Sequence, residues 1–102
     1  MPDPNSNSFF ARLGGKLFKI RFVLSREIPS DRWADCSHPN DKNKEIRVRR
    51  VIAGKERLET ILHEALHAIY PDEGESSVGC HGKDLANLLW RCGYRHTDNK
   101  RK

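Results

Sequence analysis

The sequence predicts an α+β fold, in which a small antiparallel or mixed sheet of about three strands packs on two consecutive helices. The chain has 102 residues, a length that suits one domain. Apolar and polar residues alternate in the N-terminal half, which is typical of half-buried strands. From about residue 55 the apolar spacing becomes helical, and no repeat or linker interrupts the chain.

Three segments have the pattern of strands. In residues 17–24, apolar side chains occupy alternate positions and predict a half-buried strand. Residues 32–36 predict a short second strand. Residues 45–52 predict a third strand, with its isoleucine and valine facing inward. Because Arg47 and Arg49 share the opposite face at strand spacing, we interpret this segment as a charged edge of the sheet.

Two helices are predicted to follow these strands. The first runs from Lys55 to Tyr70, where Pro71 ends it. Its apolar stripe consists of Leu58, Ile61, Leu62, Ala65, Leu66 and Ile69. The second helix begins near residues 73–75 and runs to Cys92, with Gly93 at a position that commonly terminates helices. Its apolar stripe is predicted to consist of Val78, Leu85, Leu88, Leu89 and Cys92.

The composition at both ends of the chain predicts disorder outside the domain. We assign residues 1–8 to a disordered N-terminus, residues 9–95 to the single domain and residues 96–102 to a basic, disordered tail. No apolar run approaches the ~20 residues of a membrane span. The N-terminus has no basic and apolar regions of a secretory signal. We therefore expect a cytoplasmic protein without membrane association, whose three cysteines are thiols or ligands.

The first predicted helix contains the motif H-E-x-x-H. His63 and His67 are four residues apart, so they lie on one helical face and can bind the same metal ion. By helical geometry both lie roughly 130–170° from the centre of the apolar stripe, and therefore point away from the predicted core. Glu64 lies beside them, placed to take a proton from metal-bound water. The motif predicts a zinc site with Glu64 as the catalytic base.

A catalytic zinc site needs a third protein ligand, and the residues leave three alternatives. Glu75 follows the first helix after a short connection. Cys80 comes level with the histidines if the two helices form a tight antiparallel hairpin. His81 lies on the apolar stripe of the second helix and could point at the first. Asp84 is expected to support a ligating histidine rather than to bind the metal itself.

The segment LETILHEALHAIYPD, followed by a helix ending LANLLWRCGYR, resembles the zincin metallopeptidases, and most of all the small phage- and bacteria-associated minigluzincin type. The resemblance covers roughly residues 45–95, and its firm part is the H-E-x-x-H motif. It implies a small sheet packed on an active-site helix, a second helix that supplies the third ligand, and zinc-dependent peptide hydrolysis. Glu75 resembles the glutamate that opens the ligand-bearing helix, which makes it the preferred third ligand. Cys80 and Asp84 resemble an E-x-x-x-D pattern with cysteine replacing glutamate.

The leading functional hypothesis is a minimal zinc metallopeptidase that acts on a peptide or protein substrate. The strand at 45–52 would pair with an extended substrate, and Tyr70, Tyr94 and His96 are candidates for stabilising an oxyanion. Acidic residues outnumber basic ones within residues 51–94, which favours substrates with basic residues near the scissile bond.

Two alternatives remain open. In one, the metal is structural and the chain is a non-catalytic binding module, whose basic strand or tail binds an acidic partner. In the other, the motif occurs by chance and no metal binds. A nucleic-acid partner is not expected, although the net charge is +5, because the excess of positive charge lies in residues 42–50 and the tail rather than over a broad face.

Overall fold

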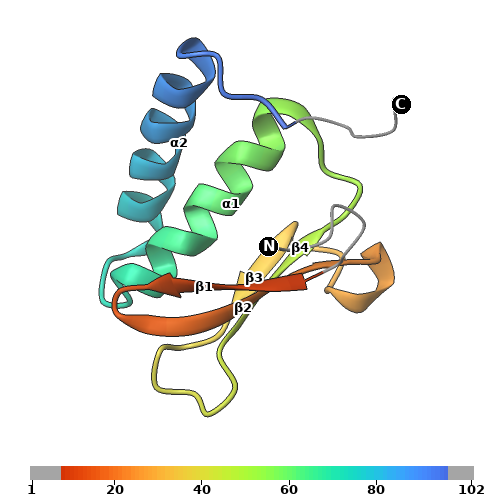
Figure 1. Ribbon diagram of the computed structural model, residues 1–102, viewed down its shortest axis with the longest axis vertical. Helices are drawn as coiled ribbons and strands as arrows, with labels where there is room; N and C mark the ends of the chain where they lie inside the picture. The colour runs from red at the N-terminus through yellow and green to blue at the C-terminus, as the bar shows by residue number, and fades with distance from the viewer. Residues whose placement is uncertain (1–7, 97–102) are drawn as a thin grey trace.

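The computed structural model describes residues 8–96, and it shows a four-stranded sheet followed by two packed helices (Figure 1). The α+β class and the order of sheet and helices are therefore as predicted. The segments 1–7 and 97–102, which carry most of the predicted disorder, lie outside the described residues. The elements are β1 (Ser8–Leu13), β2 (Lys16–Val23), the 3-10 turn η1 (Ser25–Glu27), β3 (Ala34–Cys36), β4 (Glu45–Arg49), α1 (Gly54–Ile69) and α2 (Glu75–Arg91).

The sheet is mixed and has the strand order β1-β2-β4-β3. β1 and β3 pair antiparallel with their neighbours, whereas β2 and β4 are parallel. The prediction of about three strands misses β1, whose first residue, Ser8, was expected in a disordered segment and pairs with Arg21 instead. Gly14 and Gly15 join β1 to β2 as a two-residue turn, and both have positive φ angles (59° and 80°) that glycine adopts without strain.

β4 lies inside the sheet, so the prediction that it forms a charged edge is wrong. The strand ends at Arg49, three residues before the end of the predicted segment 45–52. Its arginines are engaged within the protein. Arg47 Nε donates to Asp35 Oδ1 on β3 at 2.9 Å. The guanidinium of Arg49 donates to backbone carbonyls of the loop before β3, at 2.8 to 3.3 Å. These bonds fix the loop against the sheet, and the free edge on this side of the sheet belongs to β3.

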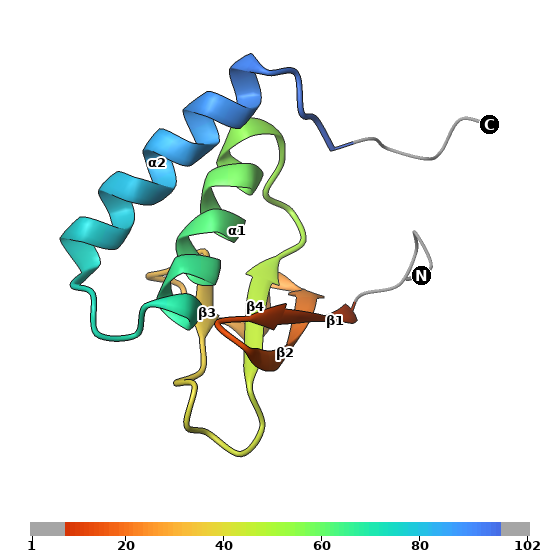
Figure 2. The ribbon, with the colours of Figure 1, turned by 60° about the vertical axis from the view of Figure 1, so that its left-hand side comes forward.

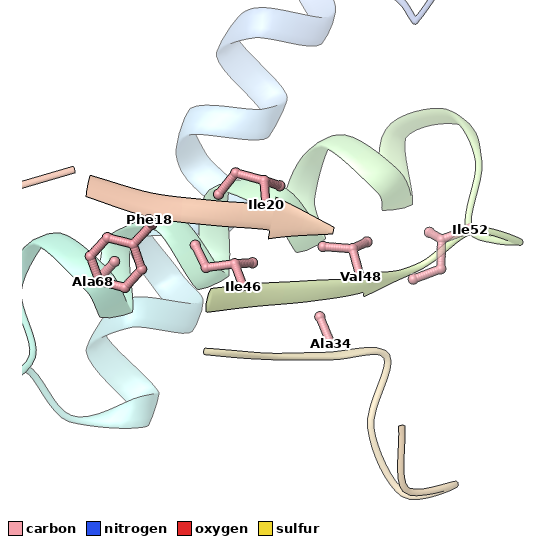
Figure 3. Packing of buried hydrophobic residues seen from close by; sticks show 7 residues of the cluster. All are labelled: Phe18, Ile20, Ala34, Ile46, Val48, Ile52 and Ala68. Carbon is pink, nitrogen blue, oxygen red and sulfur yellow. The ribbon is translucent and has the colours of Figure 1, made fainter. Parts of the chain in front are cut away.

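The hydrophobic core lies between one face of the sheet and α1 (Figure 3). Ile46 and Val48 of β4 point into it, as predicted, and are 2% and 0% exposed. Alternate residues of β2 join them from the neighbouring strand. The buried cluster consists of Phe18, Ile20, Ala34, Ile46, Val48, Ile52 and Ala68.

α1 lies between the sheet and α2 (Figure 2), and its buried residues differ from those predicted. Only Glu64 and Ala68 are buried in this helix, and neither belongs to the predicted apolar stripe. Because the sheet covers one side of α1 and α2 covers another, the residues of the predicted stripe are only half-buried. The sheet-facing side of α1 thus places a carboxyl group, that of Glu64, beneath the surface.

The face of α2 that packs on α1 is made of small residues. Val78, Gly82 and Ala86 are buried at a spacing of four residues, one helical turn apart. The prediction that Leu85 and Leu88 lie on the buried stripe is wrong, because they are 38% and 57% exposed. Small side chains let the two helix backbones approach closely, so the larger leucines remain on the outer face.

Candidate metal centre

Three side chains from the two helices converge at one point. Nε2 of His67 lies 3.2 Å from Nε2 of His63, both on α1. Glu75, the first residue of α2, places Oε1 2.8 Å from Nε2 of His67 and Oε2 2.9 Å from Nε2 of His63. All the donor atoms lie within 4.8 Å of one another. His63, His67 and Glu75 therefore form a candidate metal-binding triad.

The turn between the helices brings Glu75 to the histidines. The amide of Tyr70 donates to the carbonyl of Leu66 at 2.8 Å and closes α1, and Pro71 cannot continue the helix. The amide of Glu73 then donates to the carbonyl of Tyr70 at 3.0 Å, which reverses the chain. α2 begins directly after this turn, so its first side chain, that of Glu75, lies beside His63 and His67 in the C-terminal half of α1.

Two glycines of α2 leave room for His63. A Cβ atom at Gly82 would lie 3.4 Å from the Cα atom of His63, and one at Gly79 would lie 3.8 Å from its Cε1 atom. Glycine in a helix interior lowers helix stability by about 1 kcal/mol relative to alanine. Both distances are ordinary van der Waals contacts, so an alanine would fit at either position, whereas a larger side chain at Gly82 would meet the backbone of His63.

The donor set and its spacing suit a metal ion. Two imidazole nitrogens and one carboxylate form the His₂Glu set found in catalytic zinc sites. Bond lengths of 2.0–2.1 Å around a tetrahedral ion place the ligand atoms about 3.3 Å apart. The observed separations of 2.8 to 3.2 Å are shorter by only a few tenths of an ångström. The side chain of Glu75 is 75% exposed, so the centre is open to solvent on one side.

Glu64 is the buried acid of the site. It is 9% exposed, and within the described part of the chain its side chain has no hydrogen bond or ion pair. Burial raises its pKa from 4.5 to about 7; Glu75 and Asp35 raise it further, and Arg32 opposes them. A carboxyl group with a pKa near 7 can both accept and return a proton at neutral pH.

The triad borders a groove between β3 and α1. Two cavities, of about 410 and 570 Å³, share Arg32, Ala34, His63, Glu64 and Glu75 as lining residues, so they adjoin each other at the site. The first extends toward the N-terminal end of α1. The second follows β3 toward the connection between the helices. An elongated ligand could therefore contact the triad and β3 at the same time.

The backbone of β3 faces this groove with an unpaired edge. Trp33 and Ser37 exchange ladder hydrogen bonds with β4, since the Trp33 carbonyl accepts from Arg49 and the Ser37 amide donates to Glu45. In an antiparallel pair the bonded positions alternate, so the amides and carbonyls of Ala34 and Cys36 point to the free edge. Both residues also line the groove.

Cys36 does not offer a reactive thiol, although it lines the groove. Its Sγ donates to the carbonyl of Ser37 at 3.2 Å. Burial raises its pKa to about 12, and the nearby carboxylates of Glu64, Asp35 and Asp41 act in the same direction. The thiol is therefore protonated at neutral pH and is a poor nucleophile and metal ligand.

The other residues that the sequence suggested for the site lie elsewhere. Cys80 and His81 are exposed on α2 and do not belong to the metal-binding group found among residues 8–96. Asp84 is also exposed and contacts neither histidine through a hydrogen bond. Tyr70, Tyr94 and His96 are exposed and line neither described cavity.

Arg32 is the site residue that sequence reasoning did not identify. It lines both cavities, and its positive charge lowers the pKa of Glu64 across the groove. No local motif marks this arginine, because its position depends on the loop that Arg49 fixes to the sheet.

Comparison of the chain with protein-family models, with curated proteins and with solved structures gave no match in any of the three. Neither described helix combines the length and apolar character required to cross a membrane. What can be said about the site therefore rests on its own geometry.

Proposed function

We propose that this chain is a minimal zinc-dependent metallopeptidase of zincin type, which hydrolyses peptide bonds in an extended peptide or protein substrate. The observation that carries the proposal is the convergence of His63, His67 and Glu75 beside the buried Glu64. The groove along β3 supports it, because it gives a peptide chain access to these four residues.

In this proposal the three ligands hold Zn²⁺, whose Lewis-acid chemistry polarises the scissile carbonyl and acidifies water. His63 and His67 bind through Nε2, and Glu75 binds through its carboxylate. The ligands come from two helices, so metal binding also fastens α2 to α1. We expect the metal to stabilise the fold as well as to support catalysis.

Glu64 acts as the general base and then as the general acid. Its carboxylate accepts the proton of the attacking water and delivers it to the leaving amine. Its position supports this role, because Glu64 adjoins a ligand in the chain and lines the groove beside all three of them. Arg32, on the opposite wall, stabilises the negative charge that develops on the substrate carbonyl oxygen.

The free edge of β3 binds the substrate backbone. The outward amides and carbonyls of Ala34 and Cys36 pair with an extended peptide, which adds a strand to the sheet. This role was predicted for the strand at 45–52, and it passes to β3 because β4 is enclosed by its neighbours.

The proposal is tested by metal content and peptide cleavage of the untagged protein. We expect about one zinc ion per chain, and cleavage of an unstructured peptide library by the zinc-loaded protein. Glu64→Gln should retain zinc and lower cleavage by ~10² or more, as expected for loss of a general base. Asp84→Asn, on the exposed face of α2, is the control and should cleave like wild type.

Two results would contradict the proposal. If Glu64→Gln cleaves as fast as wild type, the activity does not arise at this site. If the zinc-loaded wild type cleaves no member of the library, the non-catalytic, metal-stabilised module becomes the better description.

A further inference from the structure

One half of the groove has the character of a binding site for a positively charged side chain. This half is the cavity of about 410 Å³ that extends from the triad along the N-terminal half of α1. Glu56, Glu59 and Thr60 line its helical wall, and Trp33 lines the wall that leads into β3. Trp33 is 60% exposed, so its indole ring is accessible to a ligand.

The carboxylates of this half differ from those at the other end of the groove. Asp31 and Asp35 both have arginine partners, at 3.3 Å and 2.9 Å. Glu56 and Glu59 form no ion pair or hydrogen bond within residues 8–96. The one cation that lines this cavity, Arg32, is the partner of Asp31. The helical wall therefore carries uncompensated negative charge.

A second feature of the same cavity also points to a ligand. Glu64 also lines it and is 9% exposed; its side chain has no hydrogen bond or ion pair among the described residues, and Arg32 is the positive charge that acts on it. The cavity thus combines a largely buried acid with two unpaired carboxylates and an accessible aromatic ring. A lysine or arginine side chain suits this wall, because its stem can pack on the indole while its charge lies near the carboxylates of Glu56 and Glu59.

The distances along α1 place this region within reach of a bound peptide. Glu59 and Glu56 precede His63 by four and seven residues, which corresponds to about 6 and 10 Å along the helix axis. An extended peptide advances about 3.3 Å per residue. A substrate side chain two or three residues from the scissile bond therefore reaches the two glutamates.

We propose that Glu56, Glu59 and Trp33 form a subsite that selects a lysine or arginine side chain of the substrate, two or three residues from the bond to be cleaved. The proposal rests on the proposed function, since it treats the groove as the substrate-binding site. The acidic composition of residues 51–94 suggested a preference for basic peptides only in general terms. The proposal assigns this preference to Glu56, Glu59 and Trp33 in the cavity of about 410 Å³.

The test measures binding and cleavage separately. Zinc-loaded Glu64→Gln protein is titrated with fluorescent alanine-rich peptides that carry one lysine, moved one position at a time, and with matched norleucine and glutamate peptides. We expect the lysine peptide to bind about tenfold more tightly than the norleucine peptide at the favoured position, as two partly exposed ion pairs allow. The same peptides are then offered to the zinc-loaded wild type.

The decisive variant is Glu56→Gln with Glu59→Gln, added to the Glu64→Gln background. It should remove the lysine preference without lowering the affinity for the norleucine peptide. The control variant, Glu73→Gln with Asp84→Asn, changes the net charge equally and lines neither cavity, so it should keep the preference.

Binding without a lysine preference, or no binding of any peptide, overturns the subsite. Loss of the preference in the control variant overturns it too, because the effect is then one of net charge. If the lysine peptide binds selectively and wild type cleaves no peptide, the subsite stands and the peptidase proposal fails. If cleavage occurs with no preference for lysine, the peptidase proposal stands and the subsite fails.

Discussion

Replacement of Glu64 by glutamine should stabilise the metal-free protein at alkaline pH, although the same change should slow peptide cleavage. Burial raises the pKa of Glu64 from 4.5 to about 7. Between pH 4.5 and about pH 7 the folded state therefore binds more protons than the unfolded state. The free energy of unfolding falls as the pH rises through this range. At about 1.4 kcal/mol per pKa unit, the fall amounts to about 3 kcal/mol by pH 8.

Glutamine has nearly the same shape and carries no charge at any of these pH values, so the variant lacks this fall. Urea unfolding of both proteins in the presence of a metal chelator measures the effect at pH 5 and pH 8. The stability of Glu64→Gln relative to wild type should increase by about 2 to 3 kcal/mol between the two pH values.

Asp84→Asn is the control for this measurement, because it removes an exposed carboxylate from α2. It should not reproduce the gain in relative stability between pH 5 and pH 8 that is expected for Glu64→Gln. If the stability difference between Glu64→Gln and wild type is the same at pH 5 and pH 8, Glu64 titrates normally. Burial then does not prepare Glu64 for proton transfer.

Three further changes have direct outcomes. Glu75→Ala should weaken zinc binding at least ~10-fold, whereas Cys80→Ser should leave it unchanged, and a zinc titration with a competing chelator compares them. Gly82→Leu should lower both the melting temperature and the zinc affinity, because a large side chain there collides with the backbone of His63; an unchanged melting temperature would contradict the close packing. A thiol reagent at pH 8 should modify the two exposed cysteines quickly and Cys36 slowly, and mass spectrometry of digested protein identifies the modified positions.

Local patterns were sufficient to predict the two helices and the histidine pair, whereas the residues alone left Glu75, Cys80 and His81 open as the third ligand. The helical period and Pro71 place the end of α1 correctly, and the spacing of His63 and His67 places both on one face. The position of Glu75 follows from the short connection after Pro71. These features depend on neighbouring residues in the chain, so they can be recognised from a single sequence.

The errors concern features set by contacts between distant segments. β1 was missed because its residues alternate poorly, although the glycine pair that follows it is a hairpin signal. The buried face of α2 was misassigned because burial there depends on how closely α1 approaches, which favours Gly82 and Ala86 over larger leucines. Strand order is likewise a property of the whole sheet, so the free edge could not be assigned to β3 in advance.

The identity of the metal ligands is the central claim, and X-ray absorption spectroscopy of the zinc-loaded protein tests it most directly. We predict a first shell of nitrogen and oxygen atoms at about 2.0–2.1 Å, with outer-shell scattering from two imidazole rings. Glu75→Ala should alter this shell, and Cys80→Ser should not. A sulfur atom at about 2.3 Å would show that a cysteine binds the metal, and it would contradict the triad of His63, His67 and Glu75.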